Sequence, residues 1–246
     1  MLRFSATRLF LDKVQRHTRL TEEEITGFLS LAGQSHSVPA DTDMVRRGDP
    51  VSSTCLVVEG LLARTVDTSS GHRQIAAFYV PGDMPDVHAA MMTSATTTLH
   101  AVSPTRVARM QRSDVDAVLR KFPVLAEALW RETIIDSIIA MEWTANIGQR
   151  QAKARLAHLF AEMAVRFGAV TSNSFEYRFP ATQENLAEAT GMTPVHVNRT
   201  LQALRAEGVL DLNSGMAHIR DWRRLVEVAG FDDGYLRYED PQRLLG

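Results

Sequence analysis

The sequence has few of the residues and patterns that mark several common protein classes. Cys55 is the one cysteine among 246 residues, which excludes an internal disulfide and an iron–sulfur cluster held by this chain alone. No apolar run approaches the roughly 20 residues of a membrane-spanning helix, and no secretory signal pattern is present. These absences predict a cytoplasmic protein with no membrane partner.

An excess of positive charge is also lacking. The 27 lysines and arginines are outnumbered by 29 aspartates and glutamates, which gives a net charge of −2. A protein that binds nucleic acid without sequence preference needs a basic stripe, so this class is disfavoured. The rest of the composition is ordinary for a globular protein, and the length allows two domains.

Residues 182–210 nevertheless carry the pattern of a helix-turn-helix. Thr182 is a good cap for a first helix, and Gly191 can end that helix in the left-handed backbone conformation. Thr193 then caps a second helix, with Pro194 at its first position, where a missing N–H costs nothing. An ordinary helical hairpin in a core is the alternative, but it does not require all of these signals at this spacing.

The second helix, from Thr193 to Glu207, divides into an apolar and a polar face. Val197, Leu201 and Leu204 recur at spacings of four and three and form one buried stripe. The opposite face carries side chains that can reach base edges in a major groove. With the two helix starts included, the candidate DNA-binding residues are Thr182, Gln183, Thr193, Pro194, Val195, His196, Asn198, Arg199 and Gln202.

The residues after this helix predict a wing. Two short apolar segments, residues 209–212 and 216–219, flank the turn signal Asn213-Ser214-Gly215. Charges across residues 182–224 cancel, which predicts weak non-specific affinity for DNA. The five basic residues are Arg199, Arg205, Arg220, Arg223 and Arg224, and the five acidic residues are Glu184, Glu188, Glu207, Asp211 and Asp221.

The first half of the chain reads as two helices followed by short strands. Thr21 and Glu24 form a capping box within the helical residues 1–31. From residue 36 to residue 110, short apolar segments alternate with glycine or proline turns, which is typical of a small barrel or jelly roll. Ser113 with Asp116 predicts the start of a further short helix.

A long helix without internal glycine or proline is predicted over residues 124–147. Its apolar stripe is too broad for one partner, so we expect one edge to pack on the barrel and the other on a second subunit. The stripe comprises Leu125, Leu129, Ile134, Ile135, Ile138, Ile139, Met141 and Trp143. The predicted organisation is residues 1–122, the connecting helix 123–148, a DNA-binding domain 149–230, and a tail 231–246 whose role the sequence does not reveal.

The order of these motifs resembles the Crp–Fnr superfamily of bacterial transcription regulators over nearly the whole chain. The Val-Val-Glu-Gly turn at residues 57–60, the Arg-Gln-Ile strand at 73–75 and the Pro-Gly-Asp loop at 81–83 carry the resemblance. It implies an α+β fold with an N-terminal β-roll similar to cyclic-nucleotide-binding jelly rolls, a dimerisation helix and a C-terminal winged helix-turn-helix. It also implies a homodimer, a palindromic site in double-stranded DNA, and RNA polymerase as a further partner.

The chain departs from the cyclic-AMP-binding members of that family. Those members have a Gly-Glu-x-Gly loop followed by Arg-Ser or Arg-Thr, whereas this chain has Asp86-Val87-His88-Ala89 and later Ala95-Thr96. A carboxylate there repels a phosphate, and with Ala95-Thr96 in place of the Arg pair no arginine is expected to face it, so cyclic AMP is not an expected effector. No cofactor is predicted, and the effector is unknown.

Other sensing chemistries of the family have little support in the sequence. The cysteine cluster of oxygen-sensing Fnr members is absent. His72, His88 or His100 could supply a haem ligand, although a lone histidine on a β-roll is more often a surface or packed residue. Cys55 could be a redox switch, but its apolar strand favours a buried, inert thiol.

The recognition helix resembles Fnr-like regulators that lack the cysteines, the FixK type among them. Arg199 matches the family's arginine and is expected to bind a guanine bidentately. Val195 replaces a common glutamate and could pack on a thymine methyl, and Asn198 could read an adenine. An effector-binding sensor that acts through protein partners, with a degenerate DNA-binding domain, is the alternative function. The sequence contains no phosphate loop, no dinucleotide fingerprint, no paired metal ligands and no nucleophile elbow, so it does not predict an enzyme.

Overall fold

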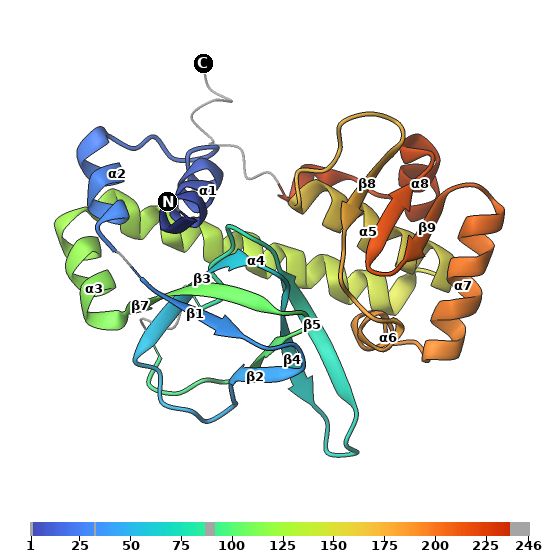
Figure 1. Cartoon of the computed structure of the whole chain (residues 1–246), viewed down its shortest axis with the longest axis horizontal. Helices are drawn as coiled ribbons and strands as arrows, with labels where there is room; N and C mark the ends of the chain where they lie inside the picture. Colours follow the sequence, from blue (N-terminus) through green and yellow to red (C-terminus); the bar gives the residue numbers. More distant parts are fainter. Residues whose placement is uncertain (1, 32, 87–91, 237–246) are drawn as a thin grey trace. The chain divides into compact units, whose positions relative to one another are not determined.

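The computed structural model describes residues 2–31, 33–86 and 92–236 (Figure 1). Contacts divide the chain into two compact units, one within Met1–Arg64 and Phe78–Ile138, the other within Thr65–Ala77 and Ile139–Leu236. The domain boundaries expected from the sequence stay a prediction. Within the described residues, no helix combines the length and apolar character needed to cross a lipid bilayer.

The N-terminal half has the expected two helices and short strands. Helix α1 spans Leu2–Val14, and α2 spans Glu22–Leu29 with the predicted capping box between Thr21 and Glu24. The strands are β1 (Gln34–Val38), β2 (Thr42–Val45), β3 (Ser53–Glu59), β4 (Leu62–Asp67), β5 (Arg73–Tyr79), β6 (Thr98–Ala101) and β7 (Thr105–Gln111). They form two sheets, with strand orders β1-β7-β3 and β2-β6-β4-β5.

Burial explains why these short strands are stable. Leu56, Val57, Ile75 and Phe78 are fully buried, so each removes apolar surface from water. The turn after β3 requires glycine, because Gly60 has φ of 93° and a side chain there would collide with the backbone of the loop before β7. The glycine predicted to mark this turn is therefore a steric requirement of the fold.

Two consecutive helices follow the strands. Helix α3 spans Arg112–Lys121 and begins at Gln111 with no side-chain cap. The predicted short helix is present, but Ser113 is its second residue and not its cap, and the Ser113 hydroxyl donates to the neighbouring Asp114 carboxylate. Helix α4 then spans Pro123–Gln149, somewhat longer than predicted.

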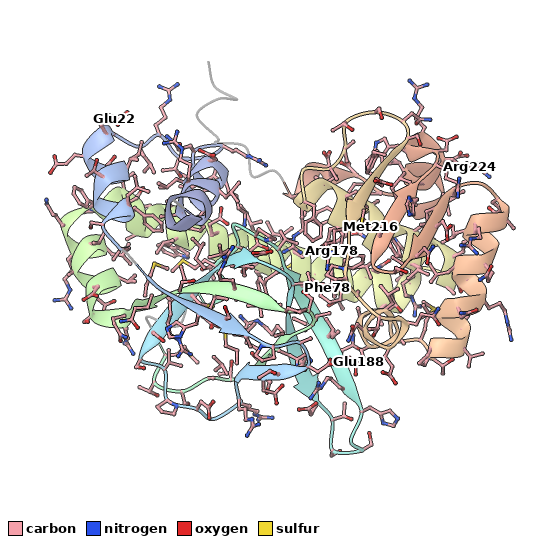
Figure 2. The ribbon with its side chains drawn as sticks, in the orientation of Figure 1. Glu22, Phe78, Arg178, Glu188, Met216 and Arg224 are labelled. Carbon is pink, nitrogen blue, oxygen red and sulfur yellow. The ribbon has the colours of Figure 1, made fainter. Side chains whose placement is uncertain are left out.

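The other unit contains the predicted winged helix. Its elements are α5 (Ala152–Arg166), β8 (Phe175–Arg178), α6 (Gln183–Thr190), α7 (Pro194–Ala206), β9 (Leu210–Asn213), β10 (Met216–Ile219), α8 (Trp222–Ala229) and a 3-10 helix η2 (Asp233–Leu236). The wing strands join β8 in a sheet of order β8-β10-β9. Arg178 of β8 is paired with Met216 of β10, and Figure 2 labels both.

A buried ionic cluster ties α1 to α4 within the first unit. Glu132 of α4 accepts from Lys13 at 2.6 Å and from His17 at 2.8 Å, and its side chain is 4% exposed. Lys13 also pairs with Asp83 at 3.2 Å. Burial by itself raises the pKa of a carboxyl group, but the Lys13 ammonium and the His17 hydrogen bond outweigh that effect and lower the pKa of Glu132.

We expect Glu132→Gln to lower the free energy of unfolding by about 3 kcal/mol near neutral pH, because it removes one partner of a buried ion pair. Since the folded-state pKa is lowered, this stabilisation exists above the unfolded-state pKa of about 4.3 and is lost as the pH falls through the folded value. Urea unfolding at several pH values measures both effects. The matched control is Glu23→Gln, whose partner Lys121 is exposed, and a loss as large as that of Glu132→Gln would contradict the prediction.

Candidate nucleic-acid interface

Both helices of the helix-turn-helix begin with the predicted caps. The Thr182 hydroxyl accepts from the Asn185 N–H at 3.1 Å, and Asn185 Oδ1 accepts from the Thr182 N–H at 2.9 Å. The Thr193 hydroxyl accepts from the His196 N–H at 3.2 Å, with Pro194 directly after it. The starts of α6 and α7 are therefore fixed in the backbone.

The turn between the helices is fixed as well. Gly191 has φ of 63° and ends α6 in the left-handed conformation, as predicted. Arg155 of α5 donates to the Thr190 carbonyl at 2.8 Å and so binds one of the unpaired carbonyls at the end of α6. Ala187 is 4% exposed, and its small side chain lets α6 and α7 pack closely. Figure 1 shows these two helices next to one another.

Helix α7 has the two faces that the sequence predicted. Val197 and Leu204 are fully buried and Leu201 is 8% exposed, so this stripe packs inside the unit. Every candidate DNA-binding residue is exposed, and Val195 stands out because an apolar side chain is 71% exposed there. The structure thus brings Thr182, Gln183, Thr193, Pro194, Val195, His196, Asn198, Arg199 and Gln202 to the surface of one motif.

Two polar residues of this face differ in their contacts. Arg199 makes no ion pair or hydrogen bond among the described residues, so its guanidinium is available to a partner. Asn198 instead donates its side-chain N–H to Gln183 Oε1 at 3.1 Å, which joins α7 to the first residue of α6. Both residues were predicted from the sequence to bind DNA, but no local pattern predicted the hydrogen bond between Asn198 and Gln183.

Arginines around α7 are neutralised by an ion-pair cluster that sequence reasoning missed. Asp211 of β9 accepts two hydrogen bonds from Arg205 at 2.9 and 2.8 Å, and Arg220 lies 3.7 Å away. The Arg205 hydrogen bonds lower the pKa of Asp211. Lys153 pairs with Glu207 at 2.8 Å. Arg205 and Arg220 are therefore each matched by a nearby carboxylate as well as in the overall count of charges.

A second network joins the end of α4 to α5 and to the segment after α8. The fully buried Glu162 carboxylate accepts from Trp143 Nε1 at 2.9 Å, from Arg166 at 3.1 Å and from the Tyr235 hydroxyl at 2.8 Å. Burial and the nearby Glu162 carboxylate raise the pKa of Tyr235, which keeps its hydroxyl a donor. At least the first residues of the predicted tail are therefore part of the folded unit, while residues 237–246 lie outside the described chain.

The first unit contains a cavity of about 280 Å³, lined by Asp86, by residues of β2, β3, β4, β6 and β7, and by the loops around residues 50 and 95. Two arginines, Arg64 and Arg109, lie in its wall, which the sequence comparison with cyclic-AMP-binding members did not reveal. Arg64 pairs with Asp86 at 3.3 Å and donates to Thr97 at 2.7 Å. The acid that replaces the family's glycine thus binds a cation of this chain itself.

The other candidate sensing residues have ordinary environments. Cys55 is 2% exposed, and burial raises the pKa of its thiol, so it is held as an unreactive thiol at neutral pH. His100 is bound to Asp43 at 2.8 Å, and exposed His72 lies 3.1 Å from the Ser70 hydroxyl. His88 lies outside the described residues.

Two family models match separate parts of the chain. The cyclic nucleotide-binding domain matches residues 35–122, and the Crp-like helix-turn-helix domain matches residues 154–228. The chain belongs to the Crp–Fnr superfamily. It is accordingly a DNA-binding transcription regulator with an N-terminal β-roll and a C-terminal winged helix-turn-helix.

Relatives within the Crp–Fnr superfamily agree with this assignment. The transcriptional activator protein FnrL of Cereibacter sphaeroides is 27% identical over 81% of this chain and 82% of its own length. The nitrogen fixation regulation protein FixK of Azorhizobium caulinodans is 29% identical over 65% of this chain and 64% of its own. The structure of FixK2 from Bradyrhizobium japonicum matches with a TM-score of 0.72 and 22% identity, covering 81% of this chain and 98% of that one.

The Asp211 cluster generates a prediction for this Crp–Fnr regulator. Asp211→Asn releases Arg205 and Arg220 beside α7, so we expect tighter binding to random-sequence DNA. The salt dependence of that binding should steepen by about one to two released counterions per protomer. Fluorescence anisotropy at several salt concentrations measures the slope.

The control for this substitution is Glu227→Gln, which makes the same change in charge and frees Arg224 on α8, labelled in Figure 2. Equal slopes for the two variants would show that only net charge matters and that the cluster has no local role.

Proposed function

We propose that the chain acts as a homodimer that binds a palindromic promoter site, with one α7 in the major groove of each half-site. The observation that carries this proposal is the exposed polar face of α7, held by two capped helix starts and containing the uncommitted Arg199. Capped N-termini also present N–H groups and a positive dipole end to phosphates. The half-sites would lie about one helical turn apart.

The proposed dimer contact is the exposed face of α4. Buried residues on the other face, among them Leu125, Ile135 and Trp143, already pack within the protomer. The exposed face has no charged side chain over almost its whole length, which is unusual for a helix surface in contact with water. From Trp130 onward the exposed residues are Trp130, Ile134, Ser137, Ala140, Met141, Thr144, Ala145, Gly148 and Gln149, and before them the exposed residues are Pro123 and the charged Glu127.

Spacing favours a second copy of the same helix as the occupant of this face. Trp130, Ile134, Ser137, Met141 and Thr144 follow one another at intervals of four, three, four and three, which is the repeat of a coiled-coil seam. Trp130 is 71% and Met141 66% exposed, so a partner helix would cover a large apolar area. Small residues between them allow the two helices to approach closely.

Each base-reading side chain has a proposed role. Arg199 binds a guanine through both of its terminal nitrogens, Val195 packs on a thymine methyl, and Asn198 reads an adenine. Thr182, Thr193, Pro194, His196 and Gln202 lie around them and contact phosphates or neighbouring bases, and Gln183 is bonded to Asn198.

Further partners follow from the relatives. FnrL is named a transcriptional activator, and we extend this to contact between the DNA-bound dimer and RNA polymerase in the cytoplasm. Arg64 in the cavity wall is paired with Asp86, and Ala95-Thr96 replaces the pair that carries the phosphate-binding arginine in cyclic-AMP-binding members, so the proposal includes no cyclic AMP.

The dimer seam is tested with Ile134→Glu. A carboxylate at the centre of the seam would be buried without a partner, so we expect dissociation to monomers at micromolar concentration. DNA affinity should fall at the same time. Analytical ultracentrifugation gives the mass. Val170→Glu is the matched control, because Val170 and Ile134 are both 39% exposed, and an Ile134→Glu protein that stays dimeric would refute the seam.

Base reading is tested by selecting binding sites from a random DNA library with purified protein. We expect a palindrome. Arg199→Ala should weaken binding to it by about 1–3 kcal/mol and relax one base pair in each half-site. Arg223→Ala, which removes the same charge from α8, should leave the selected sequence unchanged. Failure to select any sequence, with or without cell extract, would instead favour a sensor that acts through protein partners.

A further inference from the structure

The hydrogen bond between Asn198 and Gln183 connects the two helices of the DNA-binding motif on its exposed face. Asn198 Nδ2 donates to Gln183 Oε1 at 3.1 Å, although the two residues are 15 positions apart in the sequence. Both side chains are exposed, so no packing forces them together. Val195 and Arg199, the proposed readers of thymine and guanine, lie three residues before and one residue after Asn198.

We propose that Gln183 is a positioning residue that fixes the orientation of the Asn198 carboxamide and thereby makes Asn198 select adenine rather than guanine. This inference rests on the proposed base-reading role of α7. It assigns to Gln183 an effect on sequence preference, which differs from a direct contact with a phosphate.

The chemistry of the carboxamide gives this bond its consequence. An asparagine side chain carries one acceptor oxygen and two N–H donors. Gln183 engages one N–H, which leaves one acceptor and one donor. Adenine presents one donor and one acceptor in the major groove, whereas guanine presents two acceptors. The held orientation is therefore complementary to adenine, and a carboxamide turned to offer both N–H groups would suit guanine.

The backbone on both sides of the bond is rigid. Gln183 is the first residue of α6, and the reciprocal bonds between Thr182 and Asn185 fix that turn. Asn198 lies one turn into α7, after the Thr193 cap. Forming the bond therefore restricts only two side chains. Exposed hydrogen bonds of this kind are weak in water, but exclusion of water by bound DNA would strengthen the bond when reading occurs.

The experiment compares site selection and affinity for the full-length wild type, Gln183→Ala and Gln183→Glu. Wild type should prefer adenine at one position in each half-site. In Gln183→Ala, discrimination between adenine and guanine at that position should fall by about threefold to tenfold per half-site, the range for loss of one hydrogen bond. Gln183→Glu keeps an acceptor oxygen, so it should retain the adenine preference while its carboxylate weakens binding to all sequences.

A double-mutant cycle with Asn198→Ala separates positioning from direct contact. In the Asn198→Ala background, Gln183→Ala should cause no further loss of discrimination. Gln149→Ala, an exposed glutamine at the end of α4, is the control and should behave as wild type.

Each contrary outcome is distinct. Uniform weakening at all four bases by Gln183→Ala, or additive effects in the cycle, would overturn the positioning role while leaving Asn198 as a base reader. A wild-type palindrome with no base preference at this position would overturn the reading role of Asn198, and the pair with it. Selection of no palindrome at all would reject the proposed function itself.

Discussion

The fixed junction between α6 and α7 is the constraint on which the DNA-binding unit depends. A recognition helix can discriminate bases only if its side chains start from a defined place relative to the phosphates that α6 is proposed to contact. Gly191 sets the direction of the turn, and Ala187 sets the distance between the helices. The buried stripe of Val197, Leu201 and Leu204 fixes the rotation of α7. The rotation of α7 about its axis matters most, because a shift by one residue position would bury Arg199 or Asn198 in place of an apolar side chain.

Helix α4 imposes a second constraint, since its two faces serve different purposes. One face packs within the protomer, and near its end Trp143 is bound to the buried Glu162 carboxylate. Tyr235 and Arg166 also donate hydrogen bonds to the Glu162 carboxylate. Because a buried carboxylate is costly unless its oxygens are bonded, these donors hold the end of α4 and the segment after α8 against α5. The exposed face from Trp130 onward is the one proposed to contact a second copy.

Local signals made much of this structure predictable. The helix-turn-helix lies where local signals predicted it. Those signals are the caps at Thr182 and Thr193, Gly191 and the period of the buried stripe, and each depends only on residues close together in the sequence. Ser113 shows the limit of such signals. Helix α3 begins directly after β7, with Gln111 at the cap position, although Ser113 is the better cap residue. The exposed face of α4 was predicted only in part, because an apolar pattern does not show which residues of a broad stripe remain exposed. Trp130 was not among the residues predicted for the stripe.

Pairings between distant residues could not be predicted. Asp211 with Arg205, Arg64 with Asp86, and Tyr235 with Glu162 each join segments whose meeting depends on the complete fold. The sequence showed that charges near α7 sum to zero, but it did not show that Arg205 and Arg220 both pair with Asp211. Such pairs are the features that adjust function in a family whose fold is shared.

Neutralised arginines also bear on why a regulator of this kind needs two copies. With Arg205 and Arg220 committed to Asp211, each protomer offers few cations to the phosphates, and sequence-independent attraction supplies a large part of affinity in most DNA-binding proteins. A single winged helix would then hold DNA weakly. In the proposed dimer, joining two of them through α4 would make the second half-site contact intramolecular, so affinity would rise steeply without added charge. Weak attraction per protomer would then favour the palindrome, because random DNA presents no second half-site at the spacing that the proposed dimer requires.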